Sequence, residues 1–198
     1  AIAEILPRRS PSPFRVLSGT SAGAINTTVI ASRAHLFHVG IAELEHVWGN
    51  FHSSQVFKSD NWTMIRNGAH WLLAVLTGGM GDQNPLSLLD NTPLRHMLQK
   101  RINFGAIQRS IDKGYLDAVA VTVAGYTSAR SVSYYQSASH VTPWNRVRRV
   151  GRPAEIGLDH LMASIAVPIV FPPVLIGREY FGDGAMRQAT PLSPAIHL

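Results

Sequence analysis

The pentapeptide Gly-Thr-Ser-Ala-Gly at residues 19–23 constrains the fold of this chain more than any other segment. It follows a short apolar run, residues 14–18, that predicts a buried strand, and it precedes residues 24–34, which predict a helix. A serine in such a strand-to-helix turn adopts a strained conformation in crowded surroundings, so its neighbours must be small. The pattern predicts a sharp turn that holds the Ser21 hydroxyl at a helix N-terminus, whose amides favour an oxyanion.

The composition is that of a folded globular chain. With 198 residues, 45% hydrophobic and 15% charged, residues 1–198 fit a single domain with a sizeable core. The absence of cysteine excludes disulfides, thiolate metal sites and a cysteine nucleophile. The apolar run at residues 71–76 is far shorter than the about 18 residues that a membrane-spanning helix needs.

The net charge of +6 has one local concentration, at Arg146, Arg148, Arg149 and Arg152. Two interpretations remain open for this segment: a solvated loop or edge strand, and a contact with phosphate. Neither zinc-finger spacing nor interleaved aromatic residues accompany it. We therefore expect no nucleic-acid partner.

Hydrophobic periodicity and turn residues divide the chain into alternating elements. Helices are predicted over residues 1–6, 24–34, 39–51, 62–76, 92–102 and 154–166, with another beginning near residue 194. Strands are predicted over residues 14–18, 116–124 and 131–136 and in a hairpin at 174–176 and 179–181, with a loop at 78–82. This order predicts a mixed α/β layered fold with a parallel connection around the turn at residues 19–23.

A serine hydroxyl needs a neighbouring base to become a nucleophile, and Asp183 is the candidate with the most suitable setting. It lies directly after the predicted hairpin in Phe-Gly-Asp-Gly-Ala, where the flanking glycines allow close backbone approach. An Asp-Gly pair is also common in tight turns, so a purely structural role for Asp183 stays open.

Three motifs in order carry a resemblance to one family. Residues 19–26 resemble the nucleophile elbow of the patatin-like phospholipases, and residues 183–185 are similar to that family's Asp-Gly-Gly or Asp-Gly-Ala motif. Residues 162–174 resemble the segment that leads the family into its aspartate, and residues 190–196 are like the stretch that follows it. The resemblance spans nearly the whole chain.

The resemblance implies a layered patatin-like α/β fold with a central mixed, mostly parallel sheet flanked by helices. It also implies a Ser21–Asp183 dyad, with Gly19, Gly23 and Gly184 as motif residues. In that scheme Ser21 attacks a lipid ester, Asp183 takes its proton, and water releases the acyl group. Direct transfer to Asp183 requires a closely held, partly desolvated carboxylate. No metal or cofactor is implied.

One family feature is not matched. Residues 1–18 contain no Gly-rich G-G-G-x-x-G stretch, whose amides line the family's oxyanion hole. We expect that the chain is truncated at both ends and lacks the first strand and this loop. Loss of one oxyanion donor costs about 10² to 10³ in turnover, so the chain alone is expected to be nearly inactive.

Other interpretations remain open. His197 follows Asp183, which would give an α/β-hydrolase triad of Ser21, Asp183 and His197. A non-catalytic lipid-binding protein of the same fold is a second alternative. Other carboxylates compete as base: Asp90, Asp112, Asp117 and Asp159. We expect a lipid or acyl-ester substrate and a cytoplasmic protein, with transient contact to a membrane surface.

Overall fold

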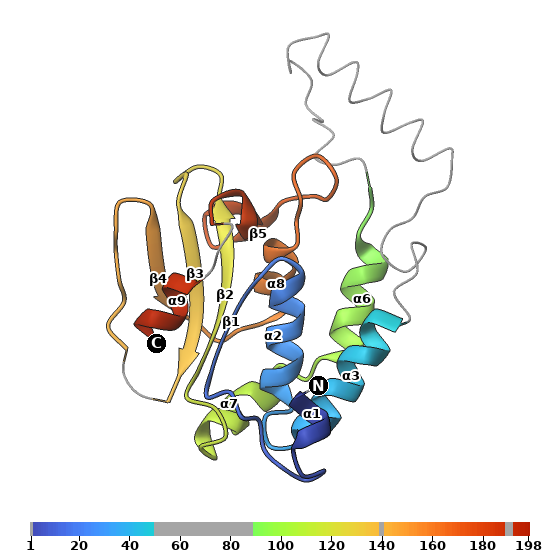
Figure 1. Ribbon diagram of the computed structural model, residues 1–198. Helices are drawn as coiled ribbons and strands as arrows, with labels where there is room; N and C mark the ends of the chain where they lie inside the picture. The colour runs from blue at the N-terminus through green and yellow to red at the C-terminus, as the bar shows by residue number, and fades with distance from the viewer. Residues whose placement is uncertain (1, 50–88, 139–140, 189–191) are drawn as a thin grey trace, which may run out of the picture.

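The computed structural model describes residues 2–49, 89–138, 141–188 and 192–198 (Figure 1). The helices are α1 (Ile2–Ile5), α2 (Ala22–Ser32), α3 (Phe37–Gly49), α6 (Thr92–Arg101), α7 (Gly105–Asp112), α8 (Leu158–Ser164) and α9 (Leu192–His197), with a 3-10 turn η1 (Gly184–Met186). The strands are β1 (Val16–Thr20), β2 (Ala118–Gly125), β3 (Ser131–Ser137), β4 (Arg149–Pro153), β5 (Val174–Ile176) and β6 (Glu179–Asp183).

The described strands form one six-stranded sheet in which β2 is central. The order is β4-β3-β2-β6-β5, and β1 also pairs with β2. Two pairings, β1 with β2 and β3 with β4, are parallel; β2 with β3, β2 with β6 and β5 with β6 are antiparallel. The predicted mixed sheet and the parallel connection after residues 14–18 are therefore confirmed, but parallel pairings are not the majority among these strands.

Two strands share one edge of β2. β1 runs parallel to the first part of β2 and ends with Thr20 opposite Thr122. β6 runs antiparallel to the last part and ends with Asp183 opposite Val123. The carboxyl ends of β1 and β6 therefore meet head to head at consecutive residues of β2. This register brings together two segments that are far apart in the sequence.

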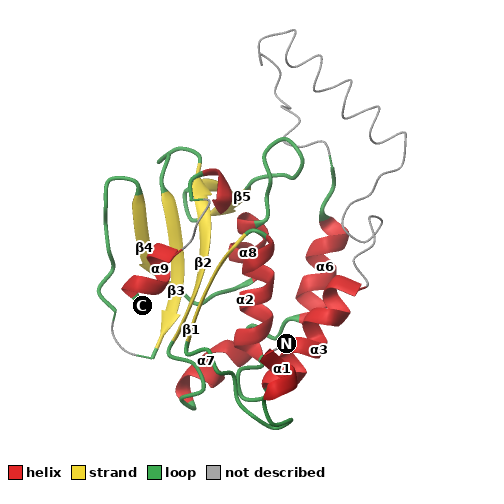
Figure 2. Cartoon of the chain, viewed as in Figure 1, coloured by secondary structure: helices red, strands yellow, loops and turns green. Residues whose placement is uncertain are grey.

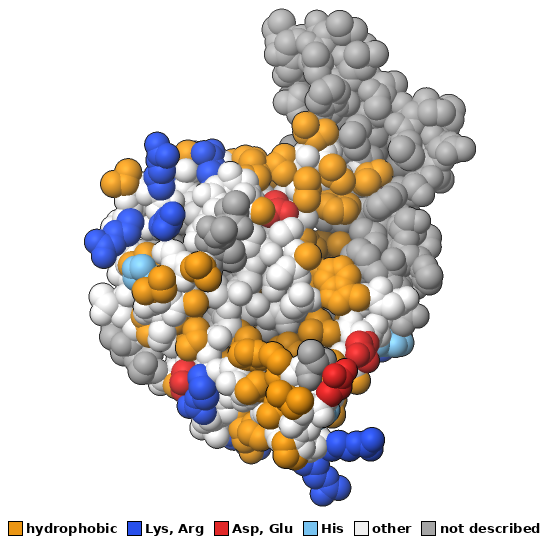
Figure 3. Space-filling model, in the orientation of Figure 1, with side chains coloured by type: hydrophobic (Ala, Val, Ile, Leu, Met, Phe, Trp, Pro, Cys, Tyr) orange, Lys and Arg blue, Asp and Glu red, His pale blue; other side chains and the backbone are white. Residues whose placement is uncertain are grey.

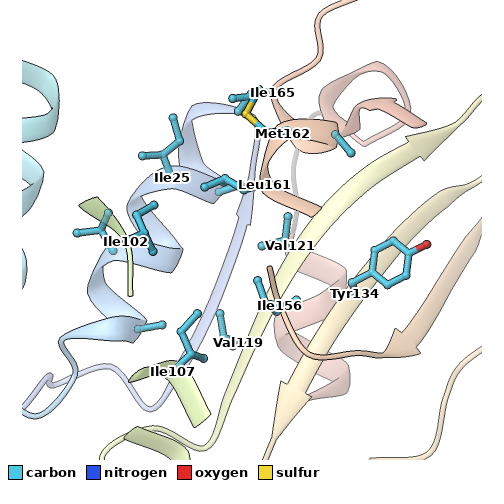
Figure 4. Close-up of a cluster of buried hydrophobic side chains, with 14 of the residues drawn as sticks. Ile25, Ile102, Ile107, Val119, Val121, Tyr134, Ile156, Leu161, Met162 and Ile165 are labelled. Carbon is cyan, nitrogen blue, oxygen red and sulfur yellow. The ribbon is translucent and has the colours of Figure 1, made fainter. Parts of the chain in front are cut away.

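Helices cover both faces of the sheet (Figure 2). On one face, α2 and α8 pack over β2, and the side chains of Ile25, Leu161 and Val121 meet in the core (Figure 4). Full burial of a side chain of this size contributes about 1.5–3 kcal/mol. On the other face Leu198, just after α9, packs against a smaller cluster that includes Ala120. Val121 and Ala120 lie on opposite faces because successive side chains along β2 point to opposite sides of the sheet.

Most predicted elements are confirmed, with specific differences. The helix predicted over residues 154–166 is shorter, at Leu158–Ser164, because Gly157 is its extended N-cap. The short helix α7 was not predicted. The predictions for residues 62–76 and 78–82 lie outside the described residues. None of the described helices has the length and apolar character needed to cross a bilayer.

Candidate active site

The turn predicted at residues 19–23 is a sharp elbow between β1 and α2. Ser21 is its strained residue, with φ 53° and ψ −129°. A non-glycine residue in such a conformation costs on the order of 1–3 kcal/mol and persists only where the surroundings fix it. A Cβ on Gly19 would collide with the Gly23 carbonyl oxygen and the Thr27 hydroxyl. Gly19 must therefore lack a side chain so that α2 can begin directly over β1.

The expectation of crowding on both sides of the serine is wrong for Gly23. A Cβ at this position would meet no heavy atom within 4 Å. The second glycine of the elbow lies on the open side of the first turn of α2, whereas the first lies between the strand and that turn. Among the described residues, steric contacts therefore require a glycine at position 19 but not at position 23.

Ser21 and Asp183 are in direct contact. The Ser21 hydroxyl donates a hydrogen bond of 2.7 Å to Oδ2 of Asp183. The other carboxylate oxygen, Oδ1, accepts a 2.8 Å hydrogen bond from the Ala185 N–H. Asp183 is only 5% exposed, so its carboxylate is closely held and largely desolvated. The arrangement can move a proton from the serine hydroxyl directly to the carboxylate.

The backbone around Asp183 is fixed on two sides. The Asp183 N–H donates to the Ala166 carbonyl at 2.8 Å, which attaches the end of β6 to the segment after α8. A Cβ on Gly184 would collide with the Thr122 carbonyl oxygen. Gly184 therefore allows the chain to turn away immediately after the aspartate, against the backbone of β2.

Sequence reasoning missed a residue that contacts the elbow, Ser164 at the end of α8. Its fully buried hydroxyl accepts a hydrogen bond of 3.0 Å from the Ser21 N–H. The same hydroxyl donates to the Thr122 carbonyl at 2.7 Å. Ser164 stands in the segment 162–174 that carried the family resemblance, but a single serine in a helical pattern gives no signal of a tertiary contact.

The N-terminus of α2 provides donors beside the serine. The first N–H groups of a helix have no carbonyl partner within it, and the helix dipole makes this end positive. In α2 these groups begin at Ala22, the residue directly after Ser21. The predicted position of helix amides next to the serine is thus confirmed. Such amides stabilise negative charge that develops on an ester oxygen.

The structure does not bring His197 to this pair. Its Nδ1 lies 2.8 Å from the Ser193 carbonyl, and its ring stacks on Trp144 with 4.7 Å between centroids. Trp144 packs with Ala120 on the face of the sheet opposite to Val123. Since Asp183 is the register partner of Val123, its side chain belongs to that other face.

The competing carboxylates have structural partners. Each accepts hydrogen bonds away from Ser21: Asp90 from Thr92, Asp112 from Gln108, Asp117 from Arg15 and Asp159 from Arg95. Among the described residues, no three His, Cys, Asp or Glu side chains gather in a way that could hold a metal ion.

The phenol of Tyr126 lies beside the last residues of β6. Its phenol lies where a Cβ on Gly182 would be, one residue before Asp183. Partial burial raises the pKa of Tyr126, and the negative charge of Asp183 raises it further.

The arginine cluster lies at the edge of the described sheet. Arg149 and Arg152 belong to β4, which pairs with β3, and the side chains of Arg146 and Arg148 are exposed in the preceding loop. The predicted solvated edge strand is confirmed. A phosphate contact at this edge stays a prediction.

Exposed apolar side chains occur in the segments next to Asp183. Val167 is 40% exposed and Ile169 is 53% exposed, both shortly after the Ala166 carbonyl that holds the aspartate. Met186, in η1, is 47% exposed. Figure 3 shows apolar side chains gathered over the loop between α8 and β5. These three side chains are exposed apolar residues close in sequence to the Ala166–Asp183 contact.

The layered mixed α/β fold with a serine elbow agrees with the comparison with known families. A family model described as patatin-like phospholipase matches residues 3–196. The chain belongs to the patatin-like phospholipase family, whose members are in general lipid acyl hydrolases. A search of curated proteins finds no match.

Proposed function

We propose that this protein is a serine acyl hydrolase of the phospholipase A or lysophospholipase type, in which Ser21 and Asp183 form a catalytic dyad. The observation that carries the proposal is the 2.7 Å hydrogen bond from the Ser21 hydroxyl to a buried carboxylate. Nucleophile and base in such contact match the geometric requirement for proton transfer during attack.

The reaction proceeds in two stages, acylation of Ser21 and hydrolysis of the acyl-enzyme. Ser21 Oγ attacks the ester carbonyl carbon while its proton moves to Oδ2 of Asp183. The tetrahedral intermediate then expels the alcohol, which takes the proton from Asp183, and leaves an acyl group on Ser21. Water attacks the acyl carbon while one of its protons moves to Asp183; the bond to Ser21 Oγ then breaks, Asp183 returns that proton to Oγ, and the fatty acid is released.

Negative charge on the former carbonyl oxygen needs donors that are already in place. The N–H groups at the start of α2, beginning at Ala22, are suitable because they lie next to Ser21 and carry the positive end of the helix dipole. Preorganised donors of this kind contribute about 10² to 10³ each in turnover.

An acyl ester of a lipid is the substrate class that the surroundings favour. Val167 and Ile169 follow the Ala166 carbonyl that accepts from the Asp183 N–H, Met186 follows Asp183 by three residues, and all three side chains are exposed. They supply apolar contact for a hydrocarbon chain next to the reacting carbonyl, and they suit brief contact with a membrane surface.

The test is release of fatty acid from a lysophospholipid and from a medium-chain glycerol ester by the natural full-length protein. We expect hydrolysis of at least one of them, and its loss in Ser21→Ala. The matched control is Ser133→Ala, which removes a buried hydroxyl that bonds the Thr122 side chain. Lipid binding without hydrolysis, or hydrolysis that survives Ser21→Ala, would replace this proposal with the non-catalytic alternative or with another nucleophile.

A further inference from the structure

The β1–β2 ladder ends at the elbow, where the Ser21 N–H bonds a side chain and not the backbone of β2. In a parallel ladder, the residue after a bridged residue can donate its N–H to the partner's carbonyl. At the start of the ladder the Arg15 carbonyl accepts from the Asp117 N–H at 2.7 Å and from the Ala118 N–H at 3.3 Å, and the second of these bonds sets the alternation of the rungs. Since Thr20 lies opposite Thr122, one further rung would join the Ser21 N–H directly to the Thr122 carbonyl.

Ser164 takes the place of that rung. Its hydroxyl accepts from the Ser21 N–H at 3.0 Å and donates to the Thr122 carbonyl at 2.7 Å. A hydroxyl has one proton to donate and lone pairs to accept, so both bonds form together and fix the orientation of the hydroxyl. One buried oxygen therefore satisfies the donor and the acceptor that the interrupted ladder leaves.

The insertion has two geometric consequences. It keeps the Ser21 backbone away from β2. The edge of β2 from Val123 onward is then free to pair with β6, which ends at Asp183. It also supports Ser21 at φ 53°, a conformation that a regular strand residue does not adopt. Both consequences favour the contact between the Ser21 hydroxyl and Oδ2 of Asp183.

We propose that Ser164 is a positioning residue, whose hydroxyl holds Ser21 out of the β1–β2 ladder and thereby aims the Ser21 hydroxyl at Asp183. The kinetic consequence rests on the proposed function. The structural consequence, a Ser21 amide held by the Ser164 hydroxyl, does not. The two are therefore tested by separate measurements.

The first comparison uses Ser164→Thr and Ser164→Val. Threonine and valine have nearly the same shape at this buried position, so strain is equal and the hydroxyl is the difference. Hydrogen exchange of the Ser21 amide, measured by NMR, is expected to be about tenfold faster in Ser164→Val than in Ser164→Thr, as for loss of one buried hydrogen bond. Equal exchange rates in the two variants would overturn the proposal, whether or not the protein hydrolyses esters.

The second comparison uses Ser164→Ala and Ser133→Ala. It also covers the case in which the protein tolerates neither threonine nor valine at position 164. Both remove a buried hydroxyl bonded to Thr122, but only Ser164 contacts Ser21. For ester hydrolysis we expect kcat to fall about 10²-fold in Ser164→Ala, because misplacement of a reacting group by about 1 Å has this effect. KM should be unchanged, and Ser133→Ala should retain kcat. Equal losses of kcat in the two variants would assign Ser164 a general structural role instead.

Discussion

Ser21 and Asp183 lie 162 residues apart in the sequence, yet the Ser21 hydroxyl contacts the Asp183 carboxylate. Ser21 directly follows β1 and Asp183 is the last residue of β6, and these two strands meet head to head on one edge of β2. β1 ends opposite Thr122 and β6 ends opposite Val123. The contact between hydroxyl and carboxylate is thus a consequence of strand register. A shift of either strand by one residue would turn its side chains to the other face and separate the pair.

Replacement of the proposed base should abolish most of the activity without unfolding the protein. Asp183→Asn keeps an oxygen that can accept from the Ala185 N–H but has no carboxylate to take the Ser21 proton. We expect kcat for ester hydrolysis to fall by about 10² to 10⁴, with an unchanged melting temperature. His197→Ala is the matched test of the triad alternative and should keep kcat. Loss of activity in His197→Ala with activity retained in Asp183→Asn would favour the triad.

The two glycines of the elbow should differ in their tolerance of a methyl group. Gly19→Ala forces a Cβ into the Gly23 carbonyl and should destabilise the protein by about 1–3 kcal/mol. Gly23→Ala places its Cβ in open space in a helix and should be neutral or stabilising by up to about 1 kcal/mol. Urea denaturation of both variants checks this order. The reverse order would contradict the described geometry of the elbow.

The pKa of Tyr126 should report the charge on Asp183. Burial and the negative charge of Asp183 both raise the pKa of this phenol. In Asp183→Asn the charge is absent and the burial remains, so the pKa of Tyr126 should fall but stay above its ordinary value. NMR titration of the tyrosine ring carbons in both proteins measures this, with Tyr126→Phe to assign the signal. An unchanged pKa would place the phenol outside the influence of the carboxylate.

The protein should become less stable at acid pH because His160 is buried. Burial lowers the pKa of His160, although the charge of Asp159 opposes this, and its Nδ1 accepts from the Gly157 N–H at the start of α8. The unfolded chain therefore binds a proton near pH 6.5, whereas the folded protein does so only at lower pH. The free energy of unfolding should decrease as pH falls below about 6.5.

The control for this prediction is His160→Asn, which supplies an acceptor near the position of Nδ1 but does not titrate. Its free energy of unfolding should decrease less between neutral pH and pH of about 5 than that of the natural protein. Parallel pH profiles for the two proteins would show that His160 contributes nothing to the acid sensitivity.

Local sequence signals predicted much of the fold. The apolar run at residues 14–18 and the Gly-Arg pair between β5 and β6 identify their strands by composition alone. The start of α6 at Thr92 was also predicted; its N-cap is Asn91, and the Asp90 carboxylate accepts from the Thr92 N–H. The helix α7 was missed because it is short and begins at Gly105, a poor helix former.

The site was only partly predictable for a physical reason. Ser21 and Asp183 stand in glycine-flanked motifs, which mark places where the backbone must turn sharply. Ser164 acts through its hydroxyl at a point where three distant segments converge, and no local pattern encodes that convergence. The openness around Gly23 likewise depends on the packing of α2 and not on the motif.

The proposed activity depends on Ser21 as a nucleophile that is activated by direct contact with Asp183. Its most direct test is the rate and position of labelling by a fluorophosphonate in the natural full-length protein, with the modified residue identified by mass spectrometry. We predict a single adduct on Ser21, with labelling slowed about 10²-fold or more in Asp183→Asn and unchanged in His197→Ala. Absence of label on Ser21, or labelling that depends on His197 and not on Asp183, would contradict activation of Ser21 by Asp183.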